Sequence, residues 1–224
     1  MSAWRYEFKY VTDRHEIETV RSLLDSLPVG LQTHHPPRWV NNVYFDDEFG
    51  RCVTENMSGI SERFKVRLRW YGDPYRIVAP RLEVKIKKNY VNSKLSSELD
   101  GAFDLQSETW SDIVKRVRSL LAQSPRIQRI FEGTSRPTLI NRYHRSYLLT
   151  SCGRVRVTLD GAQNGDIQFY NSRPNFHHSL PKQAPTIIEI KGPEKEHDTV
   201  MATADHLPFK RSRFSKYVYW MHLA

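Results

Sequence analysis

Several segments of this chain alternate between charged and apolar residues with a period of two. Within residues 61–71, the charged positions are Arg63, Lys65, Arg67 and Arg69, and the apolar positions between them are Phe64, Val66, Leu68 and Trp70. Because two is the period of a β-strand, the cations lie on one face of a predicted strand and the apolar side chains on the other. The same alternation recurs in residues 5–10, 81–87, 154–160 and 188–191. The chain therefore contains several predicted strands, each with one strongly charged face.

Such charged faces restrict how the strands can be assembled. Two like charges about 4 Å apart repel by roughly 4 kcal/mol at a near-surface effective dielectric. Cations can therefore converge only where water or anions fill the space between them. Small barrels filled by side chains normally have an apolar interior, whereas here the apolar faces are expected to point outward under helices. The pattern predicts an α+β fold, in which an antiparallel β-barrel forms a tunnel with a charged lumen and is flanked by helices.

The remaining pattern predicts the other elements. Predicted strands cover residues 5–10, 40–46, 61–71, 81–90, 138–150, 154–161, 166–170 and 186–191. Predicted helices cover residues 13–27, 110–121, 195–206 and 212–222, with one more short helix that ends by Gly59. Pro125 is expected to end the helix over 110–121, and the polar residues 171–185 are expected to form a mobile loop. Long strands in sequence with helices at intervals favour the α+β class.

Composition narrows the class of partner. The chain has 224 residues, enough for one domain with its own core, and we expect a single domain over 1–224. A net charge of +9 favours an anionic partner without separating nucleic acid, membrane surface and phosphate compounds. The two cysteines suggest neither a disulfide framework nor a metal cluster, which is typical of a reducing cytosol. We therefore expect a cytoplasmic protein, without a secretory signal or a membrane span.

Seven short motifs, taken in order, resemble a known family. They are YEFKY at 6–10, NVYFD at 42–46, RLRWYG at 67–72, EVK at 83–85, RVRVTLD at 154–160, IEIK at 188–191 and FSKY at 214–217. This series is similar to the VTC domain, the polyphosphate polymerase domain of the vacuolar transporter chaperone family. That family belongs to the triphosphate tunnel enzymes. The resemblance implies an antiparallel barrel with a charged tunnel, in agreement with the alternation.

The resemblance also implies roles for individual cations. Arg67 and Arg69 resemble the arginine pair that binds the phosphate chain, Lys85 resembles the lysine of the next strand, and Lys216 resembles the lysine of the C-terminal helix. The helical pattern alone would leave Lys216 in solvent. Substrate-binding residues implied by the motifs are Lys9, Lys94, Arg145 and Arg156, and the charged strand faces add Arg63, Lys65, Lys87, Arg154 and Lys191.

Two carboxylates are the predicted metal ligands. Glu189 resembles the residue that holds the divalent ion in the family, and Glu7 is the second candidate. Mg²⁺ or Mn²⁺ prefers oxygen ligands and takes one or two carboxylates, with the rest from substrate and water. Many tunnel phosphatases have a further glutamate where this chain has Arg5, so their two-carboxylate clamp is incomplete here. Glu83 and Asp160 are open to two interpretations, as helpers of the metal through water or as partners of neighbouring arginines.

Together these features predict a polyphosphate polymerase that transfers the γ-phosphate of ATP to a growing chain and depends on Mn²⁺ or Mg²⁺. Its predicted partners are ATP, polyphosphate or triphosphate, and a separate membrane protein. One alternative is a triphosphatase or short-chain polyphosphatase on the same fold, and another is a non-catalytic polyphosphate-binding module. A nucleic-acid binder should carry outward cations interleaved with exposed aromatic rings. Here carboxylates are interleaved with the cations, so no nucleic-acid partner is expected.

Overall fold

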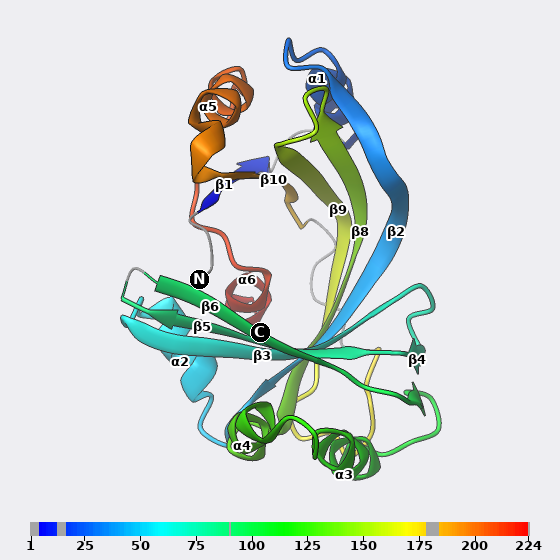
Figure 1. Cartoon of the computed structure of the whole chain (residues 1–224). Helices are drawn as coiled ribbons and strands as arrows, with labels where there is room; N and C mark the ends of the chain where they lie inside the picture. The colour runs from blue at the N-terminus through cyan, green and yellow to red at the C-terminus, as the bar shows by residue number, and fades with distance from the viewer. Residues whose placement is uncertain (1–4, 13–16, 90, 178–183, 224) are drawn as a thin grey trace. The chain divides into compact units, whose positions relative to one another are not determined.

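The structure is a computed structural model that describes residues 5–12, 17–89, 91–177 and 184–223 (Figure 1). The chain divides into two compact units. The first comprises Met1–Arg38, Tyr143–Gln163 and Pro181–Phe214, and the second comprises Trp39–Arg142, Asn164–Leu180 and Ser215–Ala224. Three long strands, β2 (Leu31–Asp46), β8 (Arg136–Thr150) and β9 (Arg156–Ile167), contribute residues to both units. That the chain forms a single domain therefore stays a prediction.

An antiparallel sheet with the strand order β1-β10-β9-β8-β2-β3-β5-β6 provides the framework. In the first unit, β1 (Arg5–Thr12) pairs with β10 (Thr186–Pro193), which in turn pairs with β9. Glu7 lies opposite Lys191, and Lys9 lies opposite Glu189. The predicted charged faces of these strands thus lie in register. Together with the helices, this antiparallel pairing confirms the predicted α+β class.

The hydrophobic core of the first unit lies on the opposite faces of these strands. The buried residues there are Val157, Leu159, Ile188 and Ile190 from the strands, Val20 and Leu24 from α1 (Ile17–Asp25), and Val200 and Ala204 from α5 (His197–Asp205). A short 3₁₀ helix, η1 (Glu194–Glu196), leads into α5. A Cβ atom at Gly192 would lie only 2.4 Å from Val200 Cγ2, so this glycine permits the close approach of α5 to β10.

In the second unit, β3 (Glu62–Tyr71) lies between β2 and β5 (Arg81–Lys88), and β6 (Val91–Glu98) pairs with the far side of β5. Arg67 lies opposite Glu83, and Arg69 lies opposite Arg81. A small second sheet is formed by β4 (Arg76–Val78) and β7 (Ala102–Asp104). The helices in the described part of this unit are α2 (Arg51–Met57), α3 (Trp110–Leu120), α4 (Pro125–Glu132) and α6 (Lys216–His222).

Helices α3 and α4 cover the apolar face of β3 and β5. The cluster there includes Val66, Leu68, Leu82 and Val84 from the strands and Ile113, Val117, Ile127 and Phe131 from the helices. Figure 1 shows α3 and α4 on one side of β3, β5 and β6, and α6 on the other. Since side chains alternate along a strand, covering the apolar face leaves the charged face on the side of α6.

Asp46, at the end of β2, joins three elements of the second unit. It is fully buried, and its carboxylate accepts hydrogen bonds from the backbone N–H groups of Cys52 (2.7 Å) and Val53 (2.9 Å) in the first turn of α2. Its Oδ2 also accepts a hydrogen bond from the Tyr217 hydroxyl of α6 at 2.9 Å. Burial and the Asp46 charge raise the pKa of Tyr217, so the phenol stays a neutral donor.

Several predicted boundaries were wrong. The predicted strand over 40–46 begins at Leu31, because the exposed residues before it, which include Pro36 and Pro37, continue β2 without an apolar pattern. The predicted strand over 166–170 does not exist as a separate element, since β9 runs on to Ile167 and a turn follows. The final helix begins at Lys216 instead of residue 212, because Ser215 caps it by accepting a hydrogen bond from the Val218 N–H.

Other elements were not predicted from the sequence, or lie partly outside the described residues. Pro125 was expected only to end a helix, but it occupies the first turn of α4, where its missing N–H costs nothing. The short strands β4 and β7 and the polar strand β6 were not predicted, because they lack an apolar alternation. Of the predicted helix over 13–27, residues 13–16 lie outside the described residues, as do residues 178–183 of the predicted loop.

The substitution Asp46→Ala should lower the free energy of unfolding by about 3 kcal/mol, because it removes the acceptor of two buried N–H groups of α2 and one acceptor of the Tyr217 hydroxyl. Chemical denaturation measures this change. Tyr217→Phe removes a single donor and should cost roughly 1 kcal/mol. The control is Tyr170→Phe, at a tyrosine that is 95% exposed. Equal stability of Asp46→Ala and wild type would contradict a joining role for this carboxylate.

Candidate functional site

The arginine pair of β3 converges on one buried carboxylate of β5. Arg67 donates from Nε to Glu83 Oε2 at 2.8 Å, and its Nη2 lies 2.6 Å from the same oxygen. Arg69 Nη1 lies 3.5 Å from Glu83 Oε2, and Lys94 on β6 pairs with Glu83 Oε1. The Glu83 side chain is only 4% exposed. Of the two interpretations left open for Glu83, the structure therefore supports pairing with neighbouring cations.

This surrounding charge keeps Glu83 ionised. Burial alone would raise the pKa of the Glu83 carboxyl, but Arg67, Arg69 and Lys94 together lower it to about 2. A carboxylate that is charged at all ordinary pH values holds the two guanidinium groups at fixed positions. Glu83 thus orients the arginines, and the planar guanidinium groups are suited to bidentate contact with phosphate oxygens.

Two residues of β2 hold the same arginines from the other side. The Asn42 side-chain oxygen accepts a hydrogen bond from Arg69 Nε at 3.0 Å, and the Tyr44 hydroxyl accepts one from Arg67 Nη1 at 3.4 Å. Each lies directly opposite its arginine in the strand register. The sequence reasoning missed both residues. The signal was present, because Asn42, Tyr44 and Asp46 alternate with Val43 and Phe45 along β2.

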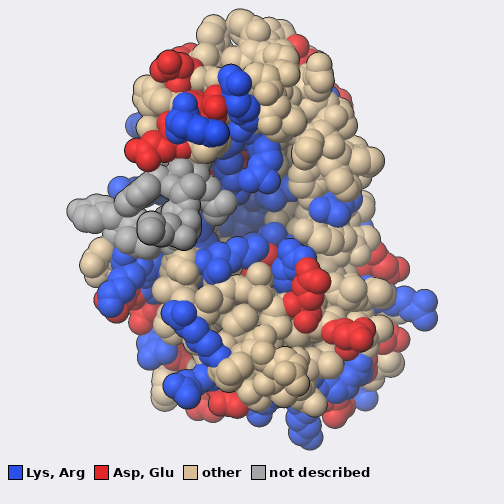
Figure 2. Space-filling model, in the orientation of Figure 1, with Lys and Arg blue, Asp and Glu red and all other residues tan. Residues whose placement is uncertain are grey.

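Three further predicted cations extend this charged face. Lys65 lies opposite Lys85, which lies opposite Lys94. Lys65 Nζ donates to the Ser215 hydroxyl at 2.7 Å, the same hydroxyl that caps α6, and Lys216 is the first residue of that helix. Figure 2 shows lysine and arginine side chains gathered over β3, β5 and β6. The structure therefore brings Lys65, Lys85 and Lys94 onto the same face as Arg67 and Arg69, next to the start of α6.

Two other predicted residues lie at the far end of this face. Arg63 lies opposite Lys87 in the register. The Arg63 guanidinium donates to the backbone oxygens of Gly59, at 3.2 Å, and Ile60, both in the loop before β3. Arg63 thus stabilises that loop in this structure. Its predicted role in substrate binding, like that of Lys87, stays a prediction.

In the first unit, the predicted metal ligands form a compact cluster with two lysines. Lys191 Nζ lies 2.7 Å from Glu189 Oε2. Lys9 Nζ lies 3.5 Å from Glu189 Oε1 and 3.2 Å from Glu7 Oε1, so one ammonium group joins both carboxylates. Lys9 also donates to the backbone oxygen of Phe214. The structure thus brings together Glu7, Lys9, Glu189 and Lys191, all of which were predicted.

These carboxylates suit a hard divalent ion. Burial alone would raise the pKa of Glu189, but Lys191 and Lys9 lower it well below its usual value, so the group is anionic. Lys9 contacts Glu7 and Glu189 together, so both carboxylates face the same cationic group. Mg²⁺ or Mn²⁺ commonly uses one or two such carboxylates beside phosphate oxygens and water. Within the described ranges, no group of three or more histidine, cysteine or acidic side chains forms a larger metal site.

The other first-unit cations differ in surroundings. Arg145 makes a bidentate pair with the buried Asp160, with its Nε 2.5 Å from Oδ1 and its Nη2 2.7 Å from Oδ2. Of the two interpretations left open for Asp160, the structure therefore supports pairing with a neighbouring arginine. Arg156 is exposed and lies opposite Lys191, next to the carboxylate cluster. Arg154 instead pairs with Glu196 of η1 at 2.7 Å, so the structure does not join it to the cluster.

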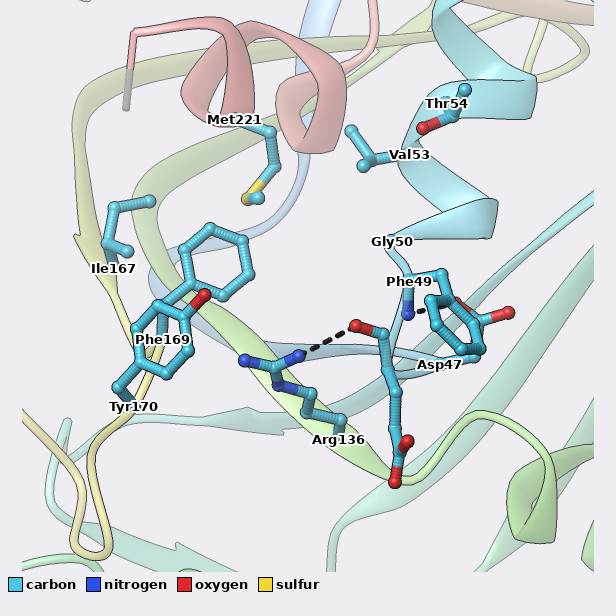
Figure 3. Close-up of a pocket in the computed structure, with 11 residues that line it drawn as sticks. Asp47, Phe49, Gly50, Val53, Thr54, Arg136, Ile167, Phe169, Tyr170 and Met221 are labelled. Carbon is cyan, nitrogen blue, oxygen red and sulfur yellow. Dashed lines mark hydrogen bonds between the residues drawn. The ribbon is translucent and has the colours of Figure 1, made fainter.

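The second unit also holds a pocket of about 610 Å³ that none of the predicted residues line (Figure 3). Its walls come from the start of α2, the end of β9 and Met221 of α6. Arg136 crosses it, donating to the Glu48 backbone oxygen at 2.8 Å and lying 5.2 Å from the Tyr170 ring centre. Aromatic and acidic groups surround this single lining arginine. Such a pocket is poorly suited to a polyanion, and the cation-rich strand face is the stronger candidate site.

Two solved structures of other proteins resemble this chain in fold. A putative adenylyl cyclase from Hippeastrum, HpAC1, described as having a dominant triphosphatase activity, aligns with a TM-score of 0.56 at 16% identity, over 98% of this chain and 96% of that one. A putative adenylate cyclase from Vibrio parahaemolyticus aligns with a TM-score of 0.51 at 10% identity, over 97% of each chain. These likenesses support the fold, and they confirm the fold class predicted from the sequence.

The family follows from the sequence match. Residues 4–224 match the VTC domain, so the chain belongs to the VTC-domain family, as the motifs indicated. No curated protein matches the chain. In the described part of the chain, every helix is too short or too polar to cross a membrane. The family supports phosphoryl-transfer chemistry on polyphosphate.

The low pKa of Glu83 predicts a specific acid sensitivity. In the unfolded chain Glu83 has its ordinary pKa of about 4.5, and in the folded protein the value is about 2. Its stabilising contribution is therefore complete above about pH 4.5 and is lost as the pH falls from 4.5 towards 2. The free energy of unfolding, measured by denaturation at a series of pH values, should fall more steeply across this window in wild type than in Glu83→Gln.

The matched control is Glu62→Gln, which removes an exposed carboxylate from the same strand pair. It should keep the wild-type pH profile. If wild type and Glu83→Gln had parallel profiles between pH 4.5 and 2, the arginines would not be held by an ionised Glu83.

Proposed function

We propose that this protein is a polyphosphate polymerase, which transfers the γ-phosphate of ATP to the end of a polyphosphate chain. The main observation is the cation-rich face of β3, β5 and β6, where Glu83 fixes Arg67 and Arg69 and where Lys65, Lys85 and Lys94 follow in register. Lysines and arginines far outnumber carboxylates on this face. It is therefore suited to an extended polyanion, whose charge the face neutralises along several phosphate groups.

Phosphoryl transfer depends mainly on positioning and neutralisation of charge. Arg67 and Arg69 bind phosphate oxygens in orientations set by Glu83, Asn42 and Tyr44. In the reaction, a terminal oxygen of the chain forms a bond to the γ-phosphorus, the bond between that phosphorus and the β,γ-bridging oxygen breaks, and ADP leaves. The attacking oxygen is already anionic, so this reaction needs no general base from the protein.

Glu189 and Glu7 are the proposed ligands of Mg²⁺ or Mn²⁺, which would neutralise phosphate charge. Lys9 and Lys191 hold these carboxylates ionised and in place. The protein supplies two adjacent acidic groups at this position, which fits a metal held partly by substrate.

Hydrolysis is the second candidate, because the Hippeastrum protein of similar fold is described as a triphosphatase. The same charged face binds triphosphate in either reaction. The difference lies in the acceptor, which is water in hydrolysis and a phosphate chain in polymerisation.

The product therefore decides between the two reactions. Incubation with ATP and Mn²⁺ or Mg²⁺ should yield long polyphosphate on a gel together with ADP, and little free orthophosphate. Stoichiometric release of orthophosphate without polymer would identify a triphosphatase. Binding of polyphosphate without any turnover would identify a non-catalytic module.

Arg67→Ala and Arg69→Ala should each lower kcat/KM by a factor on the order of 100, because each removes a fixed cation from the transferring phosphate groups. Initial rates of ADP formation measure the loss, and the melting temperature shows whether each variant is folded. The control, Arg126→Ala, removes an exposed arginine from α4. If all three variants lost activity equally, net charge and not position would be responsible.

Glu189→Gln should raise the metal concentration needed for half-maximal activity by at least about tenfold, because it removes one ionised ligand. Titration of activity with Mn²⁺ measures this shift. Binding of tripolyphosphate without metal should be retained, since a negative charge leaves a site that holds cations. An unchanged metal titration would rule out Glu189 as a ligand.

A further inference from the structure

A small pocket lies at one end of the charged face of the second unit. It has a volume of about 210 Å³ and is lined by Arg69, Tyr71, Ala79, Arg81 and Glu98. In the strand register Arg69 lies opposite Arg81, and Arg81 lies opposite Glu98. This row is two residues along from the row of Arg67 and Glu83, a distance of roughly 7 Å along the strands. The pocket therefore continues the charged face by one row.

Arg81 has a weaker partner than Arg67 and Arg69 have. It pairs with Glu98, but the Arg81 side chain is 46% exposed and the Glu98 side chain is 79% exposed. Exposed ion pairs of this kind contribute only about 0–1 kcal/mol to stability. An incoming phosphate group can therefore replace Glu98 as the partner of Arg81 with little loss of free energy. Glu83, by contrast, is buried among its cations and cannot be exchanged in this way.

The wall of the pocket is fixed by the turn before β5. Ala79 has a positive φ of 42°, which a non-glycine residue adopts only where the surrounding structure imposes it. Its N–H donates to the Gly101 backbone oxygen at 3.2 Å, and the Pro80 oxygen accepts from the Leu99 N–H at 2.8 Å. The small Ala79 side chain leaves room beside the two arginines. The space is thus part of the fold and not a gap in a loose loop.

We propose that this pocket is a further anion subsite, which binds a phosphate group of a polyphosphate chain beyond those held by Arg67 and Arg69. The inference rests on the proposed function and adds a determinant of chain length to it. The pocket is smaller than typical sites for whole small molecules, which occupy about 300–1,000 Å³. Its lining is dominated by charged side chains, so it fits a phosphate group better than a nucleobase. Glu98 competes with that phosphate for Arg81.

The test compares short and long ligands. Binding of inorganic tripolyphosphate and of a polyphosphate of defined greater length is measured by calorimetry at fixed salt. Arg81→Gln should weaken the long chain about tenfold, the loss expected for one charge-assisted hydrogen bond, and should change tripolyphosphate affinity less than about twofold. Glu98→Gln should strengthen long-chain binding several-fold, because it removes the competing carboxylate. A merely structural ion pair would not give opposite effects from its two partners.

The matched control is Arg116→Gln. Arg116 is also 46% exposed and pairs with a glutamate, Glu108, at a different surface of the same unit. It should leave both affinities unchanged. Arg81→Lys keeps the charge but loses the planar fork, and should give a smaller loss for the long chain. Melting temperatures show whether each variant is folded.

The possible outcomes separate the subsite from the proposed function. If wild type binds both ligands and Arg81→Gln weakens neither, or weakens both equally, the subsite is overturned and the proposed function stands. Parallel changes in Arg81→Gln and Arg116→Gln would show a general effect of net charge, which also overturns the subsite. If wild type binds neither ligand, the proposed function and the subsite both fail.

Discussion

Repulsion between cations on a single strand face is the constraint on which this structure depends. In each unit a buried carboxylate offsets it. Glu83 lies among Arg67, Arg69 and Lys94 in the second unit, and Glu189 lies between Lys9 and Lys191 in the first. Both carboxyl groups have pKa values below their usual range because these cations outweigh the effect of burial. Each therefore stays charged, and each fixes its partners.

The apolar faces of the same strands explain how such charge is tolerated. In the second unit, α3 and α4 cover the apolar face of β3 and β5, and in the first, α1 and α5 pack against β9 and β10. Covering one face with helices directs the cations to the other. The Asp46 carboxylate then ties α2 and α6 to the end of β2, and so places Ser215 and Lys216 beside the charged face.

The two clusters differ in character. The second-unit face carries cations in successive rows of β3, β5 and β6, whereas the first-unit cluster has two carboxylates, held by Lys9 and Lys191, that suit a hard metal ion. Membership of the VTC-domain family supports phosphoryl-transfer chemistry on polyphosphate. The exposed Arg81–Glu98 pair differs from the buried pairs, because Glu98 can move away from Arg81. The same face therefore carries arginines with a fixed carboxylate partner and one arginine with an exchangeable partner.

By itself, the sequence determined the strands with charged faces and the α+β class, because a period of two fixes which side chains share a face whatever surrounds the strand. The order of the short motifs indicated the family. It also pointed to Arg67, Arg69, Glu189 and Lys9. Only the tertiary structure decided what each charge contacts. It paired Glu83 with the arginines and Arg154 with Glu196, and it added Asn42 and Tyr44, because strand register joins residues far apart in the chain. It likewise revealed β6 and α4, whose positions depend on the neighbours they pack against and not on a pattern of their own.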